Sequence, residues 1–328
     1  MDLYVDTYGT SIRKNGNLFQ IKTEEQKSDI SPLNLKTMIL SKGVSISTDA
    51  IEMAVENNID IVVLDGYGDP YGRFWHCKFG STAYIRRKQL EILKNNVGTE
   101  LAKNWLINKI KNYSIHLRDL KTKRESKKDY IEAEMIKIQK YIYKIKLVTG
   151  NINDNRNTLM GYEGNAGKLY YGVLSELVPK EYKFEGRSMR PAKDEFNSLL
   201  NYAFGILYSK VEKCCVIAGL DPYIGLLHTD NYGKKSLVFD IIENYRHLAN
   251  RVVFQLFSQK KVNKSFFDVS SSGMLLNKSG KHVLVEEFYK LLDKKIKYNG
   301  RHITNLEKIQ YDCHEIANSL IEKEKIEG

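Results

Sequence analysis

The sequence has few cysteines, and those it has lack the spacing of a zinc site or of a disulfide framework. There is no CxxC or CxxH spacing among the four cysteines, Cys77, Cys214, Cys215 and Cys313. The sequence therefore suggests neither a zinc site nor a disulfide framework. No apolar run approaches the about 18 residues that a membrane-spanning helix needs. The first residues, MDLYVDTYG, lack the basic and apolar regions of a signal peptide. We therefore expect a cytoplasmic protein with no membrane partner.

Acidic residues are in the minority, with 40 Asp plus Glu against 51 Lys plus Arg. The net charge of +11 favours a polyanionic partner such as nucleic acid. Residues 86–146 contain 17 Lys plus Arg and 7 Asp plus Glu, a net charge of +10. This segment is either a solvated helix face or a track for DNA phosphates, which would make binding depend on salt. The candidate DNA contacts in it are Lys121, Lys123, Arg124, Lys127 and Lys128.

The hydrophobic pattern changes once along the chain. Residues 1–80 alternate like strands and contain turn signals such as Asn-Gly, with one short helix near residues 47–57. From about residue 84 the apolar residues follow helical spacing. We predict an α+β protein with a small N-terminal β-domain, residues 1–83, and a larger all-α domain, residues 84–328. Exposed strand edges make the β-domain the expected place for a dimer interface.

Glu163 lies within the apolar stripe of the segment NTLMGYEGNAGKLYYG. At helical spacing its carboxylate falls on the same face as Tyr170, Leu174 and Leu177. A carboxylate that points into packing needs a positive partner. A divalent metal ion or an arginine, such as Arg187 or Arg246, would supply one.

A second acidic cluster lies in the segment SLVFDIIENYRHLANRVVFQLF. We expect a single helix here, capped by Ser236, with Asp240 and Glu243 on the face opposite its apolar stripe. His228 ends the apolar run YIGLLH twelve residues before Asp240. Glu163, Glu243 and His228 together would make an oxygen and nitrogen site of the kind that holds Mg²⁺ or Mn²⁺. The alternatives are a solvated polar face and a hydrogen-bonded core histidine.

Four further basic residues are candidate phosphate contacts. Arg187 and Arg190 precede the helical segment that begins near residue 195, and Lys234 and Lys235 lie in the segment NYGKKS close to His228. A guanidinium presents a planar fork of donors that suits phosphate. Helix capping or an ion pair within the core is the alternative for the two arginines.

Four segments in order along the chain resemble one protein family. They read MGYEGNAGKLYYG, GRSMRPAKDEFNSLLNYAFGILY, AGLDPYIGLLH and SLVFDIIENYR, and they are similar to the CRISPR-associated integrases of the Cas "one" family, which insert new spacers. The resemblance implies an N-terminal β-sandwich-like domain, an α-helical catalytic domain and a homodimer. It also implies that Glu163, His228 and Glu243 bind the metal and that Asp240 is an accessory ligand.

The implied reaction is metal-dependent joining of a prespacer 3′-hydroxyl to the CRISPR repeat by transesterification, on double-stranded and branched DNA. The resemblance further implies a small partner, Cas "two", in a heterohexamer in which two integrase dimers flank one partner dimer. Two alternatives use the same residues differently. One is a branched-DNA nuclease with the same metal site, and the other is a noncatalytic basic DNA-binding scaffold.

Overall fold

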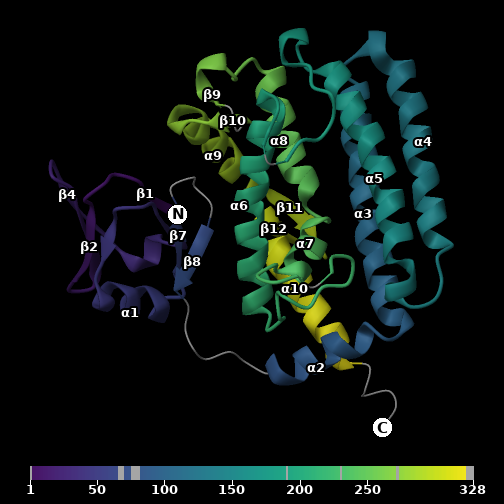
Figure 1. Cartoon of the computed structure of the whole chain (residues 1–328). Coiled ribbons are helices and arrows are strands. Elements are labelled where there is room, and N and C mark those ends of the chain that lie inside the picture. The colour runs from purple at the N-terminus through teal and green to yellow at the C-terminus, as the bar shows by residue number, and fades with distance from the viewer. Residues whose placement is uncertain are drawn as a thin grey trace. The chain divides into compact units, whose positions relative to one another are not determined.

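The computed structural model describes residues 2–65, 70–74, 82–189, 191–229, 231–270 and 273–322. The chain divides into two compact units, Met1–Gly80 and Ser81–Gly328. The first is rich in strands and the second is mostly helical, which confirms the fold class expected from the sequence (Figure 1).

The strands described in the N-terminal unit form two four-stranded sheets. In the first, β1, β5 and β7 run parallel and β8 pairs antiparallel with β7; in the second, β4, β3 and β2 form an antiparallel meander and β6 pairs parallel with β2. Their bounds are β1 Asp2–Val5, β2 Ser11–Asn15, β3 Leu18–Lys22, β4 Lys27–Ile30, β5 Thr37–Leu40, β6 Ser45–Ile46, β7 Asp60–Leu64 and β8 Pro70–Phe74. Helix α1, Thr48–Glu56, begins after Ser47, whose hydroxyl accepts the amide of Ala50.

One hydrophobic core joins the two sheets and α1. Ile12 and Phe19 from one sheet and Met38 and Ile61 from the other are fully buried in the same cluster. Strands whose alternate residues face a shared core produce the sandwich-like packing of this unit.

The C-terminal unit consists mainly of helices whose apolar faces share one core. The helices are α2 Thr82–Ile92, α3 Asn96–Lys121, α4 Lys128–Lys146, α5 Ile152–Leu177, α6 Glu195–Ile217, α7 Ser236–Ile242, α8 Arg246–Ser258, α9 Lys278–Leu292 and α10 Asn305–Glu322. Short 3₁₀ turns occupy Pro32–Asn34 in the first unit and Glu125–Lys127, Lys180–Tyr182 and Lys264–Phe266 in this one. The unit also contains two β-hairpins beside its helices, β9 Phe267–Ser270 with β10 Gly273–Leu276 and β11 Lys295–Tyr298 with β12 Arg301–Thr304. Across the described ranges, every helix is too short or too polar to span a lipid bilayer.

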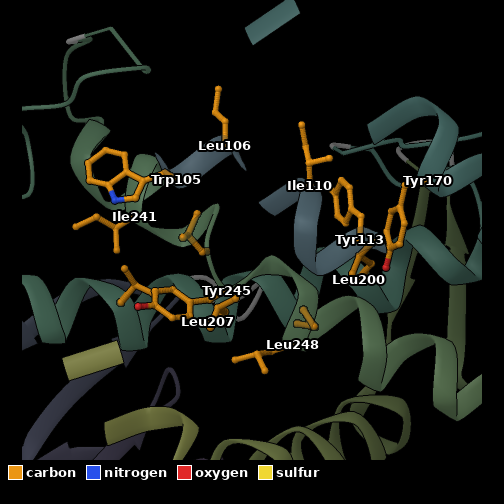
Figure 2. Packing of buried hydrophobic residues seen from close by; sticks show 14 of the residues in the cluster. Trp105, Leu106, Ile110, Tyr113, Tyr170, Leu200, Leu207, Ile241, Tyr245 and Leu248 are labelled. Carbon is orange, nitrogen blue, oxygen red and sulfur yellow. The ribbon is translucent and has the colours of Figure 1, made fainter. Parts of the chain in front are cut away.

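Helices α3, α4 and α5 pack side by side (Figure 1). Asn95 and Asn151 cap α3 and α5 by accepting backbone amides of the first turn. Tyr113 of α3 stacks on Tyr170 of α5, with their ring centroids 3.9 Å apart. Figure 2 shows this pair beside Ile110, within the core that continues to Leu200 of α6. The long axes of α3 and α5 are therefore fixed against each other by close aromatic packing.

The single helix expected from Ser236 onward is wrong, because a turn at residues 243–245 separates α7 from α8. Asn244 and Tyr245 donate their amides to the carbonyls three residues earlier. The ring of Tyr245 is buried and its hydroxyl donates to Asp312 of α10, which anchors the turn. Ser236 is the first residue of α7 rather than its cap, and its hydroxyl donates to the carbonyl of Thr229. The turn leaves Glu243 at the C-terminal end of α7.

Candidate active site

Two carboxylates from different helices meet at one lysine. The Nζ of Lys109, on α3, donates to Oε1 of Glu163, on α5, and to Oε2 of Glu243, at the end of α7. The side chains of Lys109 and Glu243 are 6% exposed and that of Glu163 is 22% exposed. The other oxygen of Glu243 accepts from Nε of Arg246 at 2.7 Å. The partner that makes Glu163 tolerable in its apolar stripe is therefore Lys109, and neither Arg187 nor Arg246 bonds to it in the described structure.

The charges in this cluster hold each other ionised. Burial alone would raise the pKa of Glu243, but Arg246 and Lys109 outweigh it and lower the pKa to about 2. For Lys109 burial acts to lower the pKa, and the attraction of Glu163 and Glu243 overcomes it, so that its pKa is raised. The pKa of Arg246 is raised for the same reason, since Glu243 outweighs burial. At neutral pH Glu243, Lys109 and Arg246 therefore all carry their charges.

Asp240 holds His228 and the loop that carries it. Asp240 is fully buried, and its Oδ2 accepts the amides of Leu226 at 2.5 Å and Leu227 at 3.0 Å. Its Oδ1 accepts the amide of His228 at 3.0 Å and contacts Nδ1 of the same ring at 2.6 Å. These four contacts occupy both oxygens of the carboxylate and position the loop, and the accessory metal role expected for Asp240 stays a prediction. Among the described residues no hydrogen-bond partner is found for the remaining ring nitrogen, Nε2, and metal-binding histidines commonly have one nitrogen bonded to a carboxylate in this way.

The three expected metal ligands are only partly brought together. Glu163 and Glu243 close on a single cation, which shows that the pair suits positive charge, and with an imidazole the donor set is one that Mg²⁺ or Mn²⁺ accepts. His228 is paired with Asp240 instead. Within the part of the chain that the structure describes, no three His, Cys, Asp or Glu side chains lie together as a metal site. The three-ligand site therefore stays a prediction.

Arg187 is held beside the cluster by amides and aromatic rings. Its guanidinium donates to Oδ1 of Asn197 and, at 2.8 Å, to Oδ1 of Asn201, both on α6. Its Cζ lies 5.4 Å from the ring centroid of Phe204, and Cζ of Arg246 lies 4.6 Å from the same centroid. One phenyl ring thus carries two guanidinium groups next to the carboxylates. Arg190, the second expected phosphate contact of this segment, lies outside the described residues.

The other basic candidates have partners on the surface of the helical unit. Lys235 bonds to Glu212 at 2.7 Å, and Nζ of Lys234 lies 5.3 Å from the ring centroid of Phe239, which also borders His228. The run on the link between α3 and α4 is mostly exposed and comprises Lys121, Lys123, Arg124, Lys127 and Lys128. In it Lys121 pairs with Glu132, and Arg124 donates to Ser258 at 2.9 Å. Lys121 lies twelve residues beyond Lys109 on α3, or roughly 18 Å along the axis. The run is therefore separate from the carboxylate cluster.

Sequence reasoning missed Lys109, although a signal for it exists. Lys109 continues the apolar stripe of Ala102, Leu106 and Tyr113 at helical spacing, as Glu163 does on α5. A single lysine and a single glutamate within two apolar stripes are complementary. The pattern does not say which helices pack together, so the pairing needs the structure.

The pKa of Glu243 generates a prediction about stability in acid. Because the folded-state pKa of about 2 lies below the ordinary 4.5, the ionised carboxylate stabilises the fold above pH 4.5, and this stabilisation is lost as the pH falls toward 2. Glu243→Gln removes this titration and leaves two buried cations with one carboxylate. We expect the variant to be less stable by about 3 kcal/mol at pH 7 and to lose less stability than the wild type between pH 5 and 3, measured by urea unfolding.

Glu286→Gln is the matched control, because Glu286 pairs with Lys290 at 2.7 Å on the surface of α9. A water-exposed pair contributes little, so this variant should follow the wild type at each pH. An acid dependence that is the same in Glu243→Gln and in the wild type would contradict the assignment.

Comparisons with known proteins agree over nearly the whole chain. Residues 3–290 match the family model described as CRISPR associated protein Cas1. The chain is 31% identical over 342 residues to CRISPR-associated endonuclease Cas1 1 of Archaeoglobus fulgidus, and the match covers 100% of this chain and 99% of that protein.

Two solved structures share the fold. A casposase bound to an integration product has a TM-score of 0.83 at 23% identity, covering 98% of this chain and 91% of that one. A chain of a Cas6-RT-Cas1–Cas2 complex has a TM-score of 0.78 at 20% identity, covering 98% of this chain and 35% of that one. The family resemblance of the four sequence segments is confirmed, and the chain belongs to the Cas1 family of CRISPR-associated proteins.

Proposed function

We propose that this Cas1 protein is a metal-dependent DNA integrase and endonuclease of CRISPR adaptation, which joins prespacer 3′-hydroxyls to the CRISPR repeat by transesterification. The observation that carries the proposal is that two carboxylates, Glu163 and Glu243, bind the same ammonium group, that of Lys109. The guanidinium groups of Arg246 and Arg187 are held nearby on one phenyl ring. The relative named as an endonuclease and the casposase bound to an integration product support the same chemistry.

In this proposal Glu163, Glu243 and Nε2 of His228 would hold Mg²⁺ or Mn²⁺. A bound divalent ion supplies Lewis acidity toward a phosphate oxygen and favours deprotonation of the attacking hydroxyl. Asp240 fixes the imidazole ring so that Nε2 is the free nitrogen. Arg246 and Arg187 hold positive charge against the negative charge that builds up on the phosphate during transfer.

The attacking hydroxyl belongs to the DNA, so no side chain has to form a covalent intermediate. The tyrosine packed against this cluster supports that assignment. Burial raises the pKa of Tyr113 well above its ordinary value, as does the nearby negative charge of Glu163. A phenol held protonated is a poor nucleophile.

We propose that the chain acts in the cytoplasm as a homodimer on double-stranded and branched DNA. Two such dimers would flank one Cas2 dimer in a heterohexamer. The match to a chain of a Cas6-RT-Cas1–Cas2 complex supports the choice of Cas2 as the partner. A branched-DNA nuclease that uses water in place of the 3′-hydroxyl, and a noncatalytic DNA-binding scaffold, are the alternatives.

The first test of the proposal runs integration in reverse. Purified protein is incubated with a branched DNA that carries a free 3′-hydroxyl at the junction, in Mn²⁺ or in EDTA. We expect resealing of the strand by the wild type in Mn²⁺, and a loss of about 100-fold in rate for Glu163→Ala and His228→Ala, because charge on the phosphate is no longer opposed. Glu286→Ala and His282→Ala replace residues of the same types on α9 and should reseal like the wild type.

Each alternative predicts a different outcome when the DNA strands of this reaction are separated by gel electrophoresis. Metal-dependent cuts without joining would favour the nuclease. Binding without chemistry in any metal would favour the scaffold. Resealing that survives Glu163→Ala would show that this carboxylate is not part of the site.

The basic run generates a second prediction about DNA binding. Each lysine or arginine that neutralises a phosphate releases counterions, so replacing the run with alanine should weaken binding and reduce the slope of log affinity against log salt by up to about 4. The affinity for a duplex is measured from about 50 to about 200 mM salt, because phosphate contacts change the affinity strongly over this range. The five replaced residues are Lys121, Lys123, Arg124, Lys127 and Lys128.

Lys281→Ala with Lys290→Ala removes positive charge from α9 instead and is the control. An unchanged salt slope in the five-alanine variant would show that the run is a solvated helix face.

A further inference from the structure

The cluster around Lys109 is electrically balanced. Two carboxylates, Glu163 and Glu243, face two cations, Lys109 and Arg246. The ammonium group comes from α3, whereas the carboxylates come from α5 and the end of α7. All three helices are fixed in the same core, so the ammonium is built into the place where the carboxylates converge.

A divalent ion and this ammonium group compete for the same oxygens. Lys109 bonds to Oε1 of Glu163 and Oε2 of Glu243, and the second oxygen of Glu243 is already bonded to Arg246. An ion bound between the carboxylates would lie within a few ångströms of a buried ammonium. Two like charges at that separation repel strongly where water is excluded. Adding two positive charges to a neutral buried cluster therefore costs binding free energy unless Lys109 moves away.

We infer that Lys109 is an internal cation that occupies the carboxylate pair before the divalent ion does, and that the ion binds by exchange with its ammonium group. The inference rests on the proposed function, because it takes Glu163 and Glu243 as ligands of the ion. The lysine side chain is a flexible chain of four carbons, so its ammonium group can move to a new partner by rotation about single bonds. A phosphate group of bound DNA is the anion that the proposed substrate offers.

Exchange couples the two ligands of the protein. When DNA supplies a phosphate for the displaced ammonium, the carboxylates become free for the ion, so each ligand tightens the binding of the other. The ion then loads mainly in the presence of substrate. If Lys109 were a fixed structural charge, it would stay between the carboxylates. DNA and the ion would then not tighten each other's binding, and loading of the ion would not depend on substrate.

The test measures Mn²⁺ affinity by electron paramagnetic resonance of the free ion, without DNA. Lys109→Met removes the competing charge and leaves two carboxylates facing Arg246 alone, so we expect binding at least about 10-fold tighter than in the wild type. Lys103→Met is the matched control, because Lys103 is also buried on α3 and bonds to Glu100 at 2.7 Å and to the carbonyl of Val148 at 2.8 Å. It should bind Mn²⁺ like the wild type.

The second measurement uses the wild type and follows the affinity for a fluorescent duplex by anisotropy, in Mn²⁺ and in EDTA at matched ionic strength. We expect Mn²⁺ to tighten DNA binding by about 10-fold in the wild type and by much less in Lys109→Met. If Lys109→Met unfolds in EDTA, Mn²⁺ should restore its melting transition, because the ion takes the place of the ammonium. A variant unfolded under both conditions would contradict exchange.

The outcomes separate this inference from the proposed function. Equal Mn²⁺ affinity in the wild type and Lys109→Met, with both proteins resealing branched DNA, would overturn the exchange and leave the integrase standing. An absence of Mn²⁺ binding in both proteins, together with resealing in EDTA, would overturn the metal site and the exchange together.

Discussion

The buried bond between one ammonium group and two carboxylates is the interaction on which the arrangement of this helical unit depends. Lys109, Glu163 and Glu243 come from α3, α5 and the end of α7, and each of these charges is tolerable only because the others are present. The stacked rings of Tyr113 and Tyr170 keep the adjoining core closed to water. Low polarity strengthens the attraction and also raises the cost of losing one partner. Helix packing and electrostatics therefore specify the same register of α3 against α5.

The turn between α7 and α8 carries one acid of this cluster. Glu243 is the C-cap of α7, and it bonds to Lys109 of α3 and to Arg246, the first residue of α8. The turn is anchored by a residue outside the site. Asp312 of α10 accepts hydrogen bonds from the hydroxyl of Tyr245 and, at 3.0 Å, from the hydroxyl of Tyr298. A side chain of α10 thus anchors the turn that follows Glu243.

Sequence patterns predicted the features that depend on local periodicity. The change from alternation to helical spacing gave the fold class, and the apolar stripe around Glu163 identified a carboxylate that needed a partner. The partner itself was missed because it lies 54 residues earlier on another helix. The contacts of Asp240 were also hidden, since helical spacing cannot show that a loop 12 to 14 residues away folds back onto its oxygens. Family motifs named residues but gave no indication of these contacts.

The positive charges of the helical unit fall into two physical classes. The basic residues between α3 and α4 have long side chains that are mostly exposed to water. Such charges attract a phosphate backbone without fixing the position of any one phosphate. Arg246 and Arg187 are ordered on the ring of Phe204, and Arg187 is further held by Asn197 and Asn201. Ordered donors need no reorganisation when charge develops on a substrate. On the proposed function, the first class brings DNA to the protein and the second opposes the charge of the reacting phosphate, so the basic composition serves affinity and chemistry through different residues.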